Sequence, residues 1–413
     1  MVAVGKKRAS TNLFVSLLFY MAYIFMPITR TLPSAMKAGF IAVALLFLIM
    51  ELTRRDNNLK NAFLLSIGFV VIDFFIYYGV WRTNNAVDIV DKSMMLFVFW
   101  MPLLYFKPLV EASDETKHKI FKMYLVFFSI EMLTTLIGNI IFPMASRELA
   151  STQDIIQNRI YQTMNIGGYG FIYALALSLP MWVYLYRYVN KMYAFFIIFG
   201  IITIAASSYM TAIALSLIAL VVSIAKTPKR AIVWGVLLAL IFITAETYLA
   251  NILNSISESL YASDNHILGE RISNISTAVL SGESTGDLGY REELRNSSMD
   301  AFWASPLLGN LVGSFKTLGL HSEFVDWLGG TGIIGVALIV VILQKPIRKF
   351  IAYFRKTRLS YYVKIQLSIC LVLGFLNLIT TAPEFSIALF ILPVVIASLT
   401  NSISMKSIKM RSR

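Results

Sequence analysis

The chain has 413 residues, of which 57% are hydrophobic and 14% are charged, and its mean hydropathy is +0.70. Soluble domains carry about 25% charged residues, so this composition excludes an ordinary soluble protein and indicates one that crosses a membrane several times. The net charge of +13 does not indicate nucleic-acid binding, because the basic residues gather in the connections between apolar segments. The single cysteine, Cys370, lies inside an apolar segment, which excludes a disulfide framework and a cysteine metal site.

About twelve apolar segments follow one another along the chain. A helix that crosses a membrane needs about 20 mostly apolar residues, and these segments approach or reach that length. The seventh and eighth are short and also fit one broken helix, so eleven spans are the alternative. The predicted fold is all-α, with spans near 12–29, 35–52, 61–81, 89–106, 119–142, 162–186, 192–206, 210–225, 231–250, 322–343, 362–381 and 385–400.

The distribution of lysine and arginine predicts the orientation of the chain. Cytoplasmic connections are richer in basic residues than outer ones. If the amino terminus is cytoplasmic, the cytoplasmic connections and the two ends hold most of the 36 basic residues, and none is left in the middle of a span. We therefore expect both termini in the cytoplasm.

The longest connection, residues 251–320, is then on the outer side of the membrane. A long loop of this kind often binds substrate or closes over it, and a structural cap is the alternative. Within it, residues 287–304 are expected to form an amphipathic helix. Acidic residues occupy the first turns, and Pro306 and Gly309 follow the end.

Arg291 and Arg295 are four residues apart on this predicted helix and so share a face. Two guanidinium groups at that spacing repel each other unless an anion lies between them, and their planar forks fit phosphate or pyrophosphate. In the alternative, Glu292 and Asp300 neutralise them on an exposed surface. Arg159, just outside the sixth span, is either a third phosphate-binding candidate or an interfacial anchor.

His321 immediately precedes the tenth predicted span. Ser322, Glu323 and Asp326 can be explained by the helix that follows, because serine caps free N–H groups and acidic side chains offset the helix dipole. A histidine gains nothing at a positive helix end, where the neutral imidazole is favoured and can accept a proton. We therefore predict acid–base chemistry for His321. The sequence has no D-x-D pair, cysteine–histidine cluster or phosphate-binding loop, so no metal or cofactor is expected.

Three acidic residues, Asp73, Glu131 and Glu246, fall inside predicted spans. Ionisable side chains are costly within a membrane and commonly have a function there. Arg159, Arg291 and Arg295 are their candidate partners, but the sequence does not pair them.

Three stretches resemble motifs of the O-antigen and capsule polymerase/ligase superfamily. They are LHSEFVDWLGGTGIIG at 320–335, YREELRNSSMDAFWASPLLGN at 290–310 and NRIYQTMNIGGYGFIY at 158–173. They resemble a histidine-led helix, an arginine-led loop helix that ends in Pro-x-x-Gly, and an arginine followed by G-G-Y-G-F-I-Y. Their order and their predicted side of the membrane also fit this family.

The resemblance implies a GT-C-like fold in the bacterial cytoplasmic membrane and a metal-independent glycosyltransferase. Its substrates would be oligosaccharides on undecaprenyl pyrophosphate, and its partner a chain-length regulator. An acceptor hydroxyl would attack the anomeric carbon of the donor, and the lipid pyrophosphate would leave. The catalytic residues would be His321 and Arg291, and substrate would be bound by Arg159, Arg295, Glu323 and Asp326.

Three functions remain open: a polymerase or a ligase within this resemblance, and a flippase or transporter as a competing class. The His-Ser pair followed by Asp326, and the G-G-Y-G-F-I-Y stretch, resemble polymerases, whereas ligases, which transfer the glycan to lipid A core, tend to have His-Asn. A flippase or transporter often has internal repeats around a long central connection, but the connection after the sixth span is short, Arg187–Lys191. A polymerase is therefore the expected function.

Overall fold

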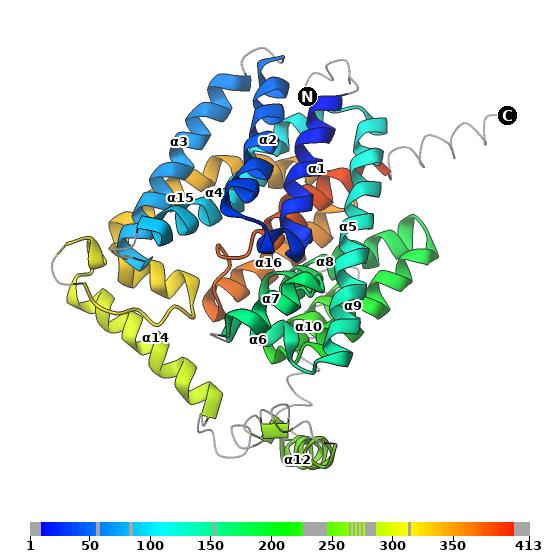
Figure 1. The fold of residues 1–413 in the computed structure, drawn as a ribbon, viewed down its shortest axis with the longest axis vertical. Helices are drawn as coiled ribbons and strands as arrows, with labels where there is room; N and C mark the ends of the chain where they lie inside the picture. Colours follow the sequence, from blue (N-terminus) through cyan, green and yellow to red (C-terminus); the bar gives the residue numbers. More distant parts are fainter. Residues whose placement is uncertain are drawn as a thin grey trace.

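The structure is a computed structural model that describes residues 10–54, 58–81, 86–151, 154–225, 246–263, 266, 269–270, 272–273, 276, 286–312 and 315–399. These residues form helices and contain no β-strand (Figure 1). The all-α prediction is confirmed for this part of the chain.

The helices of the first part of the chain are α1 (Thr11–Phe25), η1 (Pro27–Thr31), α2 (Ser34–Thr53), α3 (Asn58–Ile76), η2 (Tyr77–Trp81), α4 (Ala86–Glu111), α5 (Asp114–Ile141), α6 (Ala145–Ser151) and α7 (Ile155–Thr163). They are followed by α8 (Tyr169–Tyr188), η3 (Lys191–Tyr193), α9 (Ala194–Ala206), α10 (Met210–Ala225), α12 (Glu246–Ala262), α14 (Gly286–Ala304) and η4 (Gly309–Leu311). The last are α15 (Glu323–Phe354), α16 (Ser360–Leu376), α17 (Pro383–Ser386) and η5 (Ile387–Ile391). The helix predicted near 287–304 is α14.

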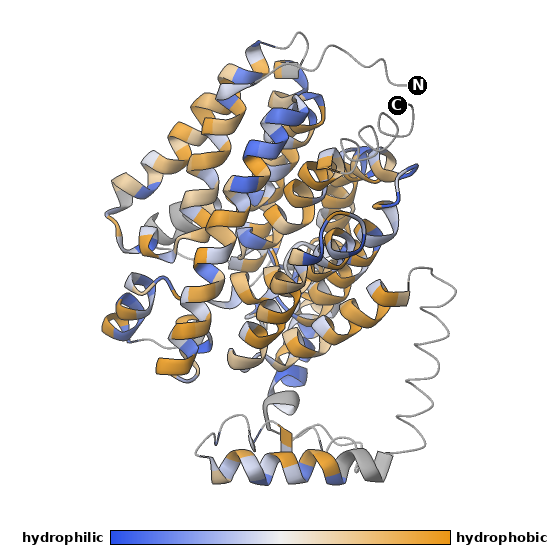
Figure 2. Ribbon diagram, turned by 90° about the vertical axis from the view of Figure 1, so that its right-hand side faces the viewer, coloured by the Kyte–Doolittle hydropathy of each residue, from blue (hydrophilic) through white to orange (hydrophobic). Residues whose placement is uncertain are grey.

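Six helices among the described residues are long and apolar enough to cross a membrane: Ala35–Thr53, Leu59–Trp81, Ser93–Glu111, Asp114–Ile141, Tyr169–Tyr188 and Glu323–Phe354. Five shorter apolar helices accompany them: Thr11–Phe25, Lys191–Ala206, Met210–Ala225, Ser360–Leu376 and Pro383–Leu399. Large apolar side chains point outward, such as Phe63, 63% exposed on α3. Figure 2 shows that hydrophobic residues predominate along most helices of the bundle. These features are typical of a membrane protein, because helices satisfy their own backbone hydrogen bonds in lipid.

Helix α8 lies at the centre of the bundle. Every side chain from Phe171 to Leu185 is buried, and α8 packs against α9, α10, α16 and α17. A helix that is apolar on all sides is stable only when it is surrounded by other helices or lipid. Arg187 near its end donates hydrogen bonds to the carbonyl oxygens of Ser223 (2.9 Å) and Ile224 (2.9 Å), which close the last turn of α10.

The sixth predicted span is wrong at its start. Residues 155–163 form the separate helix α7, and α8 begins only at Tyr169. Asn165 has a φ of 58°, which ends the first helix, and the two glycines that follow allow the chain to turn into the second. The seventh and eighth predicted spans are two separate helices, α9 and α10, because the helix is interrupted at Ser208, whose φ is also 58°.

Two further predicted spans differ from the structure or cannot be compared with it. The ninth, 231–250, lies outside the described residues except for its last five, which belong to α12. The tenth continues to Phe354, so Lys345, Arg348 and Lys349 lie on a helix and not in a loop as predicted.

The tenth predicted span is also broken, at Gly332 inside α15. This glycine has φ 63° and ψ −174°, a conformation that essentially only glycine adopts. The N–H groups of Ile333 and Ile334 donate to the carbonyl oxygens of Pro306 (2.9 Å) and Leu307 (3.1 Å) instead of to their own helix. A continuous helix was wrong here because the segment after α14 supplies the hydrogen-bond acceptors.

Candidate active site

The candidate site starts where α14 crosses the beginning of α15. Ser298, fully buried on α14, donates a hydrogen bond to Oδ1 of Asp326 (2.6 Å) and accepts one from the N–H of Gly319 (2.9 Å). A Cβ on Gly319 would overlap the backbone of Leu294, so a glycine is needed where this segment lies against α14. One serine thus joins α14, the connection after it and α15.

The carboxylate of Asp326 shapes the turn that carries His321. Its Oδ2 accepts the N–H of Ser322 (3.1 Å), and the backbone N–H groups of Leu320 and His321 also donate to this carboxylate. Leu320 has a φ of 56°, which turns three consecutive N–H groups towards one acceptor. The His321 side chain is exposed on this turn. The turn therefore holds the backbone of the histidine in one position while the imidazole faces outward.

Ser322 and Glu323 were expected to cap the helix and to offset its dipole, but their side chains bind other parts of the chain. Ser322 is the N-cap residue of α15 but makes no capping bond, and its Oγ donates to the carbonyl oxygen of Phe375 (2.8 Å). Glu323 is buried and accepts from the N–H of Ile379 (2.8 Å) and from the N–H (3.2 Å) and Oγ1 (2.6 Å) of Thr380. These bonds attach α15 to the connection between α16 and α17. The oxygens of both Glu323 and Asp326 are thus occupied by the protein itself.

We expect Ser298→Ala to lower the free energy of unfolding by about 1–3 kcal/mol, because it leaves a buried carboxylate oxygen and the N–H of Gly319 without their partner. Ser297→Ala is the matched control. The Ser297 hydroxyl donates to the carbonyl oxygen of Thr317 (2.9 Å) in an exposed position, so its loss should cost less than about 1 kcal/mol. Thermal unfolding of the two purified variants measures the difference, and equal losses would contradict a special role for Ser298.

Arg291 faces a group of three tyrosines. It is half-buried on α14, and its charge acts on the hydroxyls of Tyr169 and Tyr173 on α8 and of Tyr209 between α9 and α10. The ring centroids of Tyr169 and Tyr173 are 4.8 Å apart, and that of Tyr209 lies 6.0 Å and 5.8 Å from them. We call Tyr169, Tyr173 and Tyr209 the tyrosine cluster.

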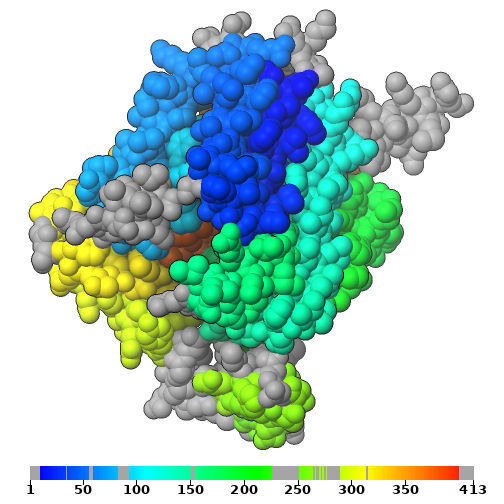
Figure 3. Space-filling view, in the orientation of Figure 1, coloured from blue at the N-terminus to red at the C-terminus, as the bar shows by residue number. Residues whose placement is uncertain are grey.

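Hydrogen bonds join the tyrosine cluster to the connection that Glu323 holds. The hydroxyl of Tyr169 donates to the carbonyl oxygen of Leu378, and that of Tyr173 accepts from Nδ2 of Asn377 (3.2 Å). The histidine turn and the tyrosine cluster are therefore attached to one frame. In Figure 3 the orange-red residues of this part of the chain are recessed between the yellow residues around the end of α14, the blue residues before α2 and the green residues of α6 and α7.

A second arginine at the cluster, Arg147 on α6, was missed from the sequence. It is half-buried, and its charge acts on Tyr173 and Tyr209. The hydroxyl of Tyr209 also donates to the carbonyl oxygen of Ser146 (3.1 Å), which places α6 beside the cluster. No motif in the sequence distinguishes Arg147 from the other outer basic residues.

The other two predicted arginines lie elsewhere. Arg295 is exposed on α14, although it is one turn from Arg291, while Ser298 and Phe302 on the same face are buried. Arg159 is exposed on α7, on a surface that it shares with isoleucines. Of the three predicted phosphate-binding arginines, the structure therefore brings only Arg291 to the tyrosine cluster.

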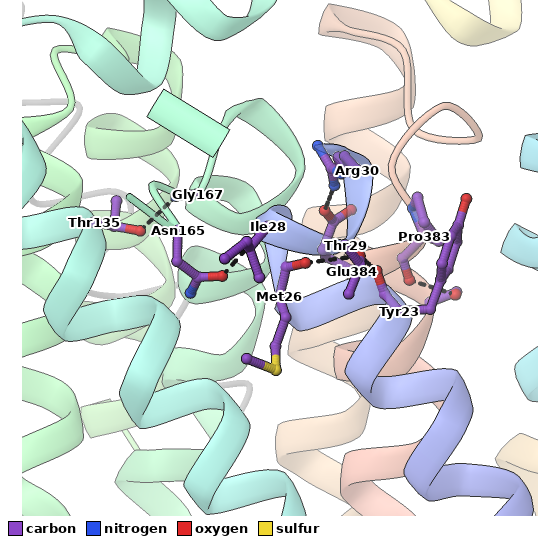
Figure 4. A network of polar contacts seen from close by, with 11 residues as sticks. Tyr23, Met26, Ile28, Thr29, Arg30, Thr135, Asn165, Gly167, Pro383 and Glu384 are labelled. Atoms are coloured by element: carbon purple, nitrogen blue, oxygen red, sulfur yellow. Dashed lines mark hydrogen bonds and ion pairs between the residues drawn. The ribbon is translucent and has the colours of Figure 1, made fainter. Parts of the chain in front are cut away.

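A separate charged group lies where η1, α5 and α17 meet. Nη2 of Arg30 is 2.6 Å from Oε1 of Glu384, and the fully buried Glu131 interacts electrostatically with both. Figure 4 shows the Arg30 and Glu384 side chains pointing towards each other. The arginine that interacts with Glu131 is thus Arg30, which comes from the first predicted outer connection and is none of the three candidates Arg159, Arg291 and Arg295. The missing side chain of Gly170 lets the Glu384 carboxylate approach the first turn of α8, whose positive dipole end favours a negative charge.

The remaining membrane acids add no site. Asp73 is buried on α3, and the side chain of Glu246 lies outside the described positions. Over the residues that the structure describes, no three His, Cys, Asp or Glu side chains are grouped as metal ligands would be.

Comparison of the sequence with models of protein families and with curated proteins finds no match. Membership of the polymerase/ligase superfamily therefore stays a prediction from three stretches of sequence. A function has to be inferred from the residues of the site, since a fold alone does not determine chemistry. The site offers Arg291 and Arg147 near the tyrosine cluster, and a histidine on a turn attached to the same frame.

Proposed function

We propose that this protein is a metal-independent glycosyltransferase of the bacterial cytoplasmic membrane, which polymerises oligosaccharide repeat units carried on undecaprenyl pyrophosphate. In this proposal the chain has twelve spans in a GT-C-like arrangement, with both termini in the cytoplasm. The observation that carries it is the tyrosine cluster with Arg291 and Arg147, attached to the same frame as the turn of His321.

The arginines would bind the leaving group. When the bond between the anomeric carbon and the pyrophosphate oxygen breaks, its electron pair stays on the pyrophosphate, which becomes more negative. Guanidinium groups held in place before the reaction stabilise this charge without reorganisation. The aromatic rings of Tyr169, Tyr173 and Tyr209 offer flat surfaces and hydroxyls to the sugar next to the pyrophosphate.

His321 would act on the acceptor. As the acceptor hydroxyl oxygen bonds to the anomeric carbon, the imidazole takes its proton and later releases it to water or to the free pyrophosphate. In this proposal Asp326 positions His321, and Glu323 positions the connection to which the tyrosine cluster is attached. This positioning role replaces the substrate binding that the sequence predicted for these two acids. Arg295 has no part in this site.

We expect His321→Ala to reduce chain growth at least about 100-fold, the usual effect of removing a general base. The assay uses membranes that contain the variant and defined lipid-linked repeat units, and the product is read as a glycan ladder. His266→Ala is the control, since it removes the other histidine of the same predicted loop. Wild-type ladders from His321→Ala, at equal amounts of protein, would contradict the catalytic role.

Deletion of the gene separates the three possible activities. For a polymerase, surface glycans should be reduced to single repeat units. A ligase would instead leave long chains on the lipid carrier and undecorated lipid A core, and a flippase would abolish every external intermediate. Either of these last two results would overturn the proposed polymerase function.

A further inference from the structure

The charged group where η1, α5 and α17 meet contains two carboxylates but one guanidinium. Glu131 is 0% and Glu384 2% exposed, while the side chain of Arg30 is 41% exposed. With both carboxylates ionised, the group would carry one uncompensated negative charge inside the protein. Burying a charge without a partner is far more costly than burying a neutral group, so this group requires one further positive charge.

The oxygen atoms of the two carboxylates show where that charge belongs. Oε1 of Glu384 accepts from Nη2 of Arg30 at 2.6 Å, and its Oε2 lies against Gly170 in the first turn of α8. Neither oxygen of Glu131 makes a hydrogen bond to any residue that the structure describes, although the side chain is completely buried. Glu384 therefore has a direct cationic partner that favours its ionised form, whereas Glu131 has none.

A proton fits this group better than a metal cation does. The other titratable groups that act on it, among the described residues, are tyrosine hydroxyls that are neutral at neutral pH: Tyr20, Tyr23 and Tyr124. A hard metal cation takes about six or more oxygen ligands. In the described part of the chain, the group offers only both oxygens of Glu131 and Oε2 of Glu384 without a hydrogen-bond partner, and the charge of Arg30 repels a second cation. A proton needs a single oxygen.

We propose that Glu131 is a proton-binding site, which holds one proton next to the ion pair of Arg30 and Glu384. Two carboxylates that act on each other commonly share one proton, since both cannot ionise without repulsion. The site lies beside the tyrosine cluster, because the ring centroid of Phe385, which follows Glu384, is 5.9 Å from that of Tyr169. The proton-binding site uses none of the residues of the proposed function and does not depend on that function.

Infrared spectroscopy of the full-length protein in nanodiscs at neutral pH tests this proposal, because a protonated carboxyl group has a C=O stretching band that a carboxylate lacks. We expect Glu131→Gln to remove one such band from the wild-type spectrum. Glutamine has the shape of the protonated side chain, so this variant should unfold at the temperature of the wild type. The control is Glu115→Gln on the same helix, an exposed carboxylate 2.8 Å from Nζ of Lys119, which should leave the band unchanged. Identical spectra of the wild type and Glu131→Gln would mean that Glu131 is ionised and would overturn the site.

Glu384→Gln separates a proton that balances the ion pair from a carboxyl group that is neutral through burial alone. Without the second negative charge, Arg30 can pair with an ionised Glu131, so the band should disappear although Glu131 is still present. A band that persists in this variant would overturn the link between the proton and the ion pair. The wild-type band should also be the same in sodium and in choline buffers. A band that appears only after sodium is removed would identify a sodium site and overturn the proton.

Discussion

Arg291→Ala is expected to reduce chain growth from lipid-linked repeat units by about 10²–10³-fold, the typical effect of removing one preorganised group that stabilises transition-state charge. Arg291 is half-buried, and its charge acts on all three members of the tyrosine cluster, so in the proposed function it lies beside the leaving group. The measurement is the initial rate of polymer formation in membranes with equal amounts of each variant.

Arg291→Lys should be nearly as damaging as Arg291→Ala. Lysine keeps the charge but lacks the planar fork that contacts two phosphate oxygens at once. A fully active lysine variant would show that charge alone is sufficient and would remove the argument for bidentate binding.

Arg295→Ala is the matched control on the same helix. Its side chain is exposed one turn from Arg291, and the rate should stay close to that of the wild type. If both alanine variants were equally impaired, the phosphate would lie between the two arginines, as the spacing in the sequence suggested, and our assignment of Arg147 as the second arginine would be wrong.

Gly332→Ala should destabilise the protein by roughly 2–6 kcal/mol. The unusual backbone conformation contributes about 1–3 kcal/mol. The new Cβ would overlap the carbonyl group of Leu307, and relieving such an overlap costs about 1–3 kcal/mol more. Thermal unfolding of the purified protein and the amount recovered from membranes are the measurements.

Gly39→Ala provides the control for this substitution. Gly39 lies in α2, and a Cβ there would meet no atom within 4 Å. Alanine favours a helix over glycine, so this variant should be as stable as the wild type or slightly more so. A Gly332→Ala protein of equal stability would mean that α15 can close into a continuous helix without the segment that follows α14.

The break in α15 illustrates what apolar composition does not reveal. G-G-T-G-I-I-G lies within an apolar segment. The hydropathy of such a segment is the same whether its backbone N–H groups donate hydrogen bonds to their own helix or to another part of the chain. Irregular backbone at membrane depth is stable only where protein covers it. That cover comes from Pro306 and Leu307, and their approach depends on how α14 packs, which no local pattern encodes.

The candidate site shows the same division between local and distant information. The sequence drew attention to Arg291 and His321 because charged residues beside apolar segments are conspicuous, and their roles stay predictions. It did not reveal that Arg159 and Arg295 are exposed away from the tyrosine cluster, since helical spacing gives the direction of a side chain relative to its own helix and not what lies opposite. Arg147 and the tyrosine cluster were not predicted, because aromatic residues are common throughout this chain.

By itself, the sequence determined that the chain is helical and of the membrane type. Both follow from local hydrophobicity, because only structures that satisfy their own backbone hydrogen bonds are stable in lipid. Only the tertiary structure decided which charges meet. Arg30 pairs with Glu384, which lies hundreds of residues later in the sequence. Glu323 binds the connection at Ile379 and Thr380, which lies tens of residues later. Such pairs are selected by the cost of burying a charge without a partner, which depends on the packed neighbours and not on the order of residues in the chain.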